Sequence, residues 1–268
     1  MENIAGELGA GFYSGLRYIG GMAWLFADAL FFIFIAPFSK RKLRVRGEPV
    51  LEQMVRVGFS SLGIVCLVQL FIGVVIALQL ANLLKTFGIK EYVGSVVGLG
   101  IFRELGPLMT GMVMAGYAGA AMSAELGTMA VSEEIEALRA LAISPVRYLV
   151  APRLIAAALM IPCVTIIGDF VGVLGGMGIA WSVLHITPSL FIKMMLETLV
   201  TSDVVVGIFK SWVFAVLITL IACFEGLRVD SGAEGVGRAA TRSVVFSVVM
   251  IISADCLFAA VFRILLGR

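Results

Sequence analysis

The sequence predicts an all-α integral membrane protein. Of its 268 residues, 60% are hydrophobic and only 14% are charged, whereas soluble domains carry roughly 25% charge. Mean hydropathy is +1.06, and the apolar residues gather in long runs. A helix that crosses a bilayer needs about 20 such residues, so the chain has room for about five or six of them.

The first apolar stretch, residues 22–38, is short. Asp28 interrupts it, Pro37 ends it, and the basic segment 40–46 follows at once. We interpret it as an amphipathic elbow helix that lies in the cytoplasmic interface. The alternative is a sixth span, which would move the N-terminus to the outside.

Five stronger apolar runs follow, and we interpret them as membrane-spanning helices. Several exceed the ~20 residues that a span needs, so tilt, kinks or a break are expected, with Pro107 and Pro162 inside the second and third spans. The chain divides into an N-terminal interfacial region, 1–56, and a transmembrane domain, 57–268. The predicted spans cover residues 57–84, 93–124, 149–184, 204–224 and 244–266.

The basic residues predict the orientation of the spans, because Lys and Arg collect on the cytoplasmic side. Segments 40–56, 139–153 and 228–242 hold twelve of the 20 Lys and Arg, and five spans place all three segments inside. The C-terminus is then external. So is the 181–202 connection, which predicts a short amphipathic helix capped near Thr187 and Pro188.

Charged residues inside or at the ends of the spans cost a few kcal/mol each to insert, on the order measured for translocon insertion, so they imply partners or water-filled space. Lys210 and Asp255 are candidates to pair across the fourth and fifth spans. Arg103 and Glu104 either pair and orient helices or contact a ligand, and both readings stay open. The full set is Arg103, Glu104, Glu125, Asp169, Lys210, Glu225 and Asp255.

Small residues recur every four positions, as in Gly168, Gly172 and Gly176. This spacing lets helix backbones approach closely, which drives packing in lipid. It predicts a tight bundle or a dimer and no particular function.

The segment between the second and third spans predicts a charged helix of about ten residues on the cytoplasmic side. Ser132 can cap it, and Glu133 and Glu134 suit its first turn, while Pro145 disfavours helix at Ser144. An apolar stripe is formed by Ile135, Leu138 and Leu141 or Ala142. The helix is either inert in the interface or a coupling helix that docks into an ATPase.

Soluble-enzyme chemistry finds no support in the sequence. It has no Walker lysine loop, no metal-spaced His/Cys cluster and no GxSxG. We therefore predict no catalytic residue, no metal site and no cofactor in this chain, and any energy-coupling module must be another polypeptide.

A series of motifs resembles the MlaE/YrbE permease family and stands in family order from about Met54 to the C-terminus. Gln79 within GVVIALQ comes first. The later motifs are RELGPLMTG, AGYAGAAMSAELGTM, EEIEALRALAISP, APR, DFVGVLGG, KSWVFA and GAEGVGRAATRSVV.

The resemblance implies a permease subunit of an ATP-driven lipid transporter in the bacterial inner membrane. It implies phospholipid movement to or from an MCE-protein assembly, with a role in outer-membrane lipid asymmetry. The implied partners are a second copy of the chain, a cytoplasmic ABC ATPase dimer that binds ATP and Mg, and a hexameric periplasmic MCE-domain protein. A small STAS-type cytoplasmic subunit is compatible with this assembly, and no nucleic acid is implied.

The resemblance also implies roles for particular residues. Substrate binding is expected at Arg103, Glu104, Leu70, Val74, Leu78, Gln79, Lys210 and Asp255. ATPase coupling is expected at Glu133, Glu134, Ile135, Glu136, Leu138, Arg139, Leu141 and Ser144. The chain departs from the family at Tyr117, where AGYAG stands in place of AGRAG, so the use of that position cannot be carried over.

Two other functions stay open at this point. One is a scaffold that anchors an MCE assembly without transport. The other is an ion-coupled carrier with a proton relay through Asp169 or Asp255. Lipid identity and the direction of movement are not determined by the sequence.

Overall fold

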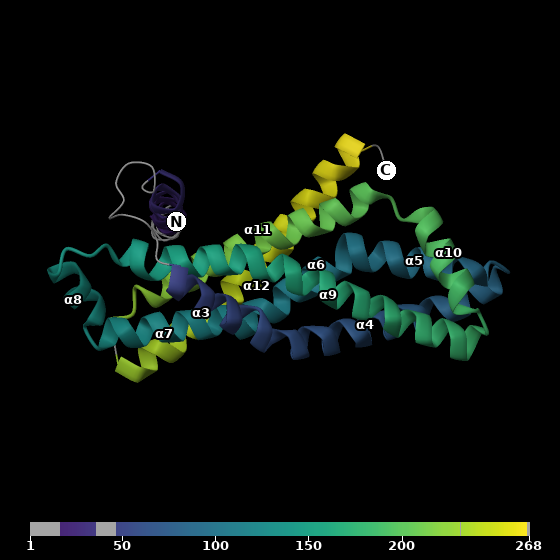
Figure 1. Cartoon of the computed structure of the whole chain (residues 1–268), viewed down its shortest axis with the longest axis horizontal. Coiled ribbons are helices and arrows are strands. Elements are labelled where there is room, and N and C mark those ends of the chain that lie inside the picture. The colour runs from purple at the N-terminus through teal and green to yellow at the C-terminus, as the bar shows by residue number, and fades with distance from the viewer. Residues whose placement is uncertain (1–16, 36–46, 231, 267–268) are drawn as a thin grey trace, which may run out of the picture.

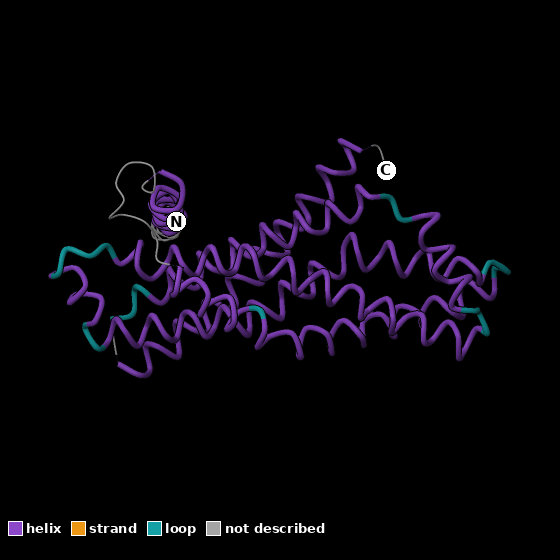
Figure 2. Tube along the Cα trace, in the orientation of Figure 1, coloured by secondary structure: helices purple, strands orange, loops and turns teal. Residues whose placement is uncertain are grey.

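The computed structural model describes residues 17–35, 47–230 and 232–266, and within these residues it contains helices and loops but no strand (Figures 1 and 2). Within these ranges, five helices are long and apolar enough to cross a membrane. The predicted all-α membrane fold with five spans is therefore confirmed. The spans are Gly47–Thr86, Lys90–Val131, Val146–Leu184, Thr201–Gly226 and Gly232–Phe262.

The first apolar stretch forms a helix over residues 17–30 that continues into a π-helical turn, η1 (Phe31–Ile35). Within the described residues it is not among the five helices that are long and apolar enough to span, and the elbow interpretation stays a prediction. Leu25 and Ala29 are buried. Pro37 and the basic segment 40–46 lie outside the described residues.

The first span comprises α3 (Gly47–Val57), a short 3₁₀ turn, η3 (Phe59–Ser61), and α4 (Leu62–Thr86). Helix α4 packs along α9 (Ala151–Leu184), and the two backbones almost touch: a Cβ on Gly73 would lie 1.8 Å from the carbonyl oxygen of Gly172. Gly168 and Gly176 face the same helix. The predicted packing role of these glycines is confirmed.

The second span runs through η4 (Lys90–Tyr92), α5 (Val93–Gly100), η5 (Ile101–Leu105), α6 (Gly106–Met114), η6 (Ala115–Gly119) and α7 (Ala120–Val131). Pro107 does not break this helix. Proline has no N–H and its ring clashes with the carbonyl four residues earlier. The π-helical turn η5 widens the helix directly before it, with the Gly106 N–H donating to the Ile101 carbonyl.

The third span repeats this solution. The π-helical turn η7 (Val146–Val150) precedes Pro152, and the Ala151 N–H donates to the Val146 carbonyl. Pro162 lies inside α9 without ending it. Pro107 and Pro162 therefore both lie inside continuous helical spans. The break that the sequence allowed at these positions does not occur.

The two ends of the bundle carry different short helices (Figure 1). Helix α8 (Glu134–Ala140) lies at one end and α10 (Pro188–Thr198), the predicted external helix, toward the other. Pro188 occupies the first turn of α10 as expected. The left-handed backbone of His185 ends α9, so this histidine has a structural position.

The prediction for the start of α8 is wrong in one respect. Ser132 does not cap α8: its hydroxyl donates to the Thr128 carbonyl at 3.0 Å and to the Glu134 carboxylate at 3.0 Å. Ser132 ends α7, and the residue before α8 is Glu133, with φ of 60°. The helix is therefore seven residues long instead of about ten.

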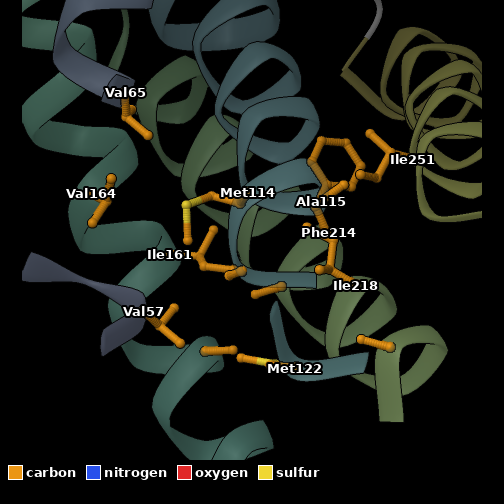
Figure 3. Close-up of a cluster of buried hydrophobic side chains, with 14 residues drawn as sticks. Val57, Val65, Met114, Ala115, Met122, Ile161, Val164, Phe214, Ile218 and Ile251 are labelled. Carbon is orange, nitrogen blue, oxygen red and sulfur yellow. The ribbon is translucent and has the colours of Figure 1, made fainter. Parts of the chain in front are cut away.

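The fourth and fifth spans are α11 (Thr201–Gly226) and α12 (Gly232–Leu266). Helix α11 is the central helix, with α6, α7, α9 and α12 all packed on it. Figure 3 shows the core that results, where Phe214 and Ile218 of α11 meet Met114, Ile161 and Ile251.

We expect Gly73→Ala to destabilise the protein by about 1–3 kcal/mol, because the added methyl group overlaps the Gly172 carbonyl and forces α4 from α9. Gly63→Ala is the matched control, since a Cβ there meets open space on the same helix. Unfolding in mixed micelles, followed by circular dichroism, measures both. Equal stability of the two variants would contradict the packing assignment.

Candidate functional site

Five charged side chains form a continuous chain of ion pairs across three segments of the bundle. The Arg103 guanidinium lies 3.2 Å from the Asp203 carboxylate and 3.8 Å from that of Glu104. The Lys210 ammonium contacts Glu104 and lies 2.9 Å from Oδ1 of Asp255, an ion-pair distance without hydrogen-bond geometry. The predicted pairing of Lys210 with Asp255 is therefore present, and η5, α11 and α12 are joined through it.

The local structure explains how these groups meet. Asp203, Gly207 and Lys210 share one face of α11, because they are four and three residues apart. Gly207 allows that face to reach η5: a Cβ there would lie 2.0 Å from the Phe102 carbonyl oxygen. The other oxygen of Asp203 accepts the Val200 N–H at 3.2 Å, which fixes the start of α11.

The five side chains differ in their exposure to solvent. Lys210 is fully buried, whereas the Glu104 side chain is 37% exposed. Lys210 therefore positions the carboxylates on either side of it, and Glu104 is the member most open to a ligand. Asp203 is absent from the sequence-based set. In the sequence, Asp203 follows Thr201 and Ser202 at the start of a helix. That position indicates helix capping rather than ion pairing.

A second polar cluster lies beside the first. The Gln69 amide donates to the Gly106 carbonyl at 2.8 Å and to the Thr110 hydroxyl at 3.1 Å. The Asp169 carboxylate approaches Gly106 so closely that a Cβ there would lie 1.9 Å from its Oδ1. This cluster ties α4, α6 and α9 together next to the ion-pair chain. Asp169 lies in this cluster and makes no ion pair with a described residue.

The four residues expected to help line a cavity lie on α4 and take no part in the ion-pair chain. Leu70 faces α9, where its Cδ1 would lie 3.1 Å from a Cβ on Gly175. Val74 is half-buried, and Leu78 and Gln79 are exposed. Their place in a substrate cavity stays a prediction.

Toward the end of the bundle that carries α8, Glu125 of α7 is held by two arginines. Its Oε2 lies 2.7 Å from Arg56 of α3 and 3.1 Å from the nearly buried Arg153 of α9. Sequence reasoning placed Glu125 among the charges that imply partners or water-filled space, and it identified neither arginine. Tyr117 lines a pocket of about 270 Å³ together with Arg56 and Glu125, so Arg56 supplies a cation at this pocket.

The residues expected to couple to an ATPase lie on and around α8 and differ in exposure. Ile135 is buried in the chain's own core, and Leu138 packs partly against it. Leu141 is 70% exposed. The apolar stripe therefore splits into an inward part and one outward residue. The exposed polar members are Glu133, Glu134, Glu136 and Arg139, and Ser144 is half-buried.

No group of three or more His, Cys, Asp or Glu side chains in the described parts of the chain is arranged to hold a metal ion. The charges of the site pair with one another instead. The arrangement suits binding and helix positioning.

Comparison with known proteins agrees with this architecture. The family model described as "Permease MlaE" matches residues 50–261. A probable ABC transporter permease protein of Rickettsia prowazekii is 37% identical over 86% of this chain and 89% of its own length. The intermembrane phospholipid transport system permease protein MlaE of Haemophilus influenzae is 33% identical, with the same shares covered.

A relative from a plant also matches this chain. The Arabidopsis thaliana chloroplastic protein TRIGALACTOSYLDIACYLGLYCEROL 1 is 35% identical over 82% of this chain and 63% of its own length. The five apolar spans of the described residues define a multi-pass membrane protein. The chain belongs to the MlaE permease family of ABC transporter permeases.

We expect Lys210→Met to destabilise the protein by about 3–5 kcal/mol, because it leaves two carboxylates without their buried counter-ion. Lys210→Met combined with Glu104→Gln and Asp255→Asn removes the stranded charges and should recover most of the loss. Unfolding in mixed micelles measures both proteins. A triple variant no more stable than the single one would contradict the pairing argument.

Proposed function

We propose that this chain is the membrane subunit of an ATP-driven transporter that moves phospholipid between the bacterial inner membrane and a periplasmic MCE-protein assembly. The single observation that carries the proposal is the ion-pair chain through Arg103, Glu104 and Lys210, in a chain of the MlaE permease family. The Haemophilus relative is named for intermembrane phospholipid transport. A buried charge network in a membrane marks a substrate or ion pathway by default.

The position of the network fits a head-group site. Asp203 and Lys210 lie near the start of α11, the end that follows external helix α10. At 1.5 Å per residue, Lys210 is about 15 Å from that end, so the network occupies the outer half of the span. Acyl chains would then lie against the apolar surface of α4, including Leu70, Val74 and Leu78.

The net charge of the network indicates which class of head group it would bind. Three carboxylates and two cations leave one negative charge uncompensated, and the exposed member is Glu104. The ammonium of a head group such as phosphatidylethanolamine would pair with this carboxylate. In this proposal Glu104 contacts the lipid, and Lys210 and Asp255 position it.

The proposed assembly has two copies of this chain, a cytoplasmic ATPase dimer that binds ATP and Mg, and an MCE-domain hexamer outside. Helix α8 would seat in a groove of each ATPase. Its inward residue Ile135 anchors it to α7 and α9, and the exposed Leu141 directly after the helix and the acidic side chains meet the partner. ATP-driven closure of the ATPases would then move the cytoplasmic ends of the spans.

We expect Glu104→Gln to lower ATP-dependent transfer of phosphatidylethanolamine by about tenfold or more, because a charge-assisted hydrogen bond contributes roughly 1.5–3 kcal/mol. Transfer of phosphatidylglycerol, which lacks the ammonium, should change far less. Fluorescent lipid transfer from proteoliposomes that contain the complete complex measures both. Equal losses for the two lipids would argue against the ammonium contact, and no loss for either would argue against the site.

We expect Leu141→Asp to weaken ATPase association by about tenfold, because it places a charge in an apolar contact worth roughly 1.5 kcal/mol or more. Leu196→Asp on α10 is the matched control, since Leu196 is 62% exposed at the opposite end. Co-purification in detergent measures association, and thermal unfolding checks the fold. Unchanged association of the Leu141 variant would overturn the coupling assignment.

A further inference from the structure

A basic pocket of about 530 Å³ lies at the cytoplasmic end of the bundle, away from the ion-pair chain. It is enclosed by the helix over residues 17–30, the end of α11 and the beginning of α12. Its charged lining consists of Arg228, Arg238, Arg242, Glu225 and Asp230. A second pocket of about 530 Å³ adjoins it and shares Arg238 and Arg242.

Among the described residues, two of the three guanidinium groups have no carboxylate partner. Arg228 lies over the Phe224 ring, 4.8 Å from its centroid, and neither Arg228 nor Arg242 forms an ion pair with any residue in the described ranges. Both guanidiniums act on Tyr18: burial and the Glu225 carboxylate raise the pKa of this phenol, and the two arginines oppose the rise. Arg228 and Arg242 therefore converge on one space, where they are available to an anion.

The pocket changes character with depth. Arg238, Arg242 and Phe246 follow one another at four-residue intervals on one face of α12, and all three line both pockets. Val245 and Phe246 are 54% and 41% exposed, one turn further into the span. The guanidinium groups thus lie at the membrane surface, and the apolar surface of Val245 and Phe246 continues from them into the span. This arrangement is complementary to an amphiphile with a phosphate head group.

We propose that this pocket binds a phospholipid of the cytoplasmic leaflet, with its phosphodiester held by Arg228 and Arg242 and an acyl chain along Val245 and Phe246. Guanidinium is the group best suited to phosphate, which it binds through two parallel hydrogen bonds. Basic pockets between spans on the cytoplasmic side hold lipid head groups. Asp230 and Glu234 at the rim would accommodate an amine on the same head group. This lipid is a resident of the inner leaflet and is separate from the cargo proposed above.

The test uses the full chain in liposomes of phosphatidylethanolamine and phosphatidylglycerol with a trace of phospholipid that carries a diazirine near the glycerol. After irradiation, mass spectrometry maps the labelled peptides. We expect label on the peptide around Val245 and Phe246. Arg228→Ala with Arg242→Ala should lower it roughly tenfold, the scale of one lost charge-assisted contact. Lys193→Ala, an exposed cation on external helix α10, is the control and should leave it unchanged.

The outcomes separate the alternatives. Label that is unchanged in the double variant, or in the milder Arg242→Gln if the double variant fails to fold, overturns the proposal. Displacement of the label by millimolar inorganic phosphate would instead assign the pocket to a soluble anion. Loss of the label only when an ATPase is bound would assign it to a protein partner. Label on the peptide around Arg103 reports the proposed cargo site instead. Because the two peptides are measured separately, the pocket assignment and the cargo-site assignment can each be contradicted without the other.

Discussion

The fully buried ammonium of Lys210 is the interaction on which the membrane bundle depends. A lysine in this position has no water to solvate it, and its insertion is unfavourable unless carboxylates replace the water. Glu104 from the second span and Asp255 from the fifth do so. Because Lys210 itself belongs to the fourth span, a single cation fixes the relative positions of three helices. Lipid supplies no hydrophobic force to do this.

That arrangement needs backbones that come unusually close. Gly207 lets α11 meet η5 at the Phe102 carbonyl, so that the carboxylate of Asp203 and the ammonium of Lys210 both reach the turn. The π-helical turn η5 directly precedes Pro107, whose ring and missing N–H disfavour regular α-helical hydrogen bonding at this point. This turn carries Arg103 and Glu104. The polar cluster of Gln69 and Asp169 supports the same turn from the side of α4 and α9.

Much of the fold could be predicted because the physics of a membrane is simple to recognise in a sequence. Apolar run length predicts the spans, and the cost of an isolated charge predicts the pairing of Lys210 with Asp255, whereas the orientation inferred from the basic residues stays a prediction. What could not be predicted depends on contacts between distant segments. Asp203 resembles a helix cap, and nothing near Glu125 in the sequence indicates that Arg56 and Arg153 converge on it. The start of α8 could not be predicted for a related reason, because the Ser132 hydroxyl donates to the Thr128 carbonyl of the preceding helix, α7.

The second span connects both ends of the molecule. In the half of the span nearer α10, η5 holds the exposed carboxylate of Glu104. At its other end, α7 leads directly into α8. Between them, Glu125 pairs with arginines from the first and third spans, so ion pairs link α7 to α3 and α9. A push on α8 would thus be distributed over three spans and would reach the ion-pair chain through a continuous helix. If lipid movement is coupled to ATP in this family member, the second span is the mechanical element best placed to couple them, and Glu125 is the residue that makes it act with its neighbours.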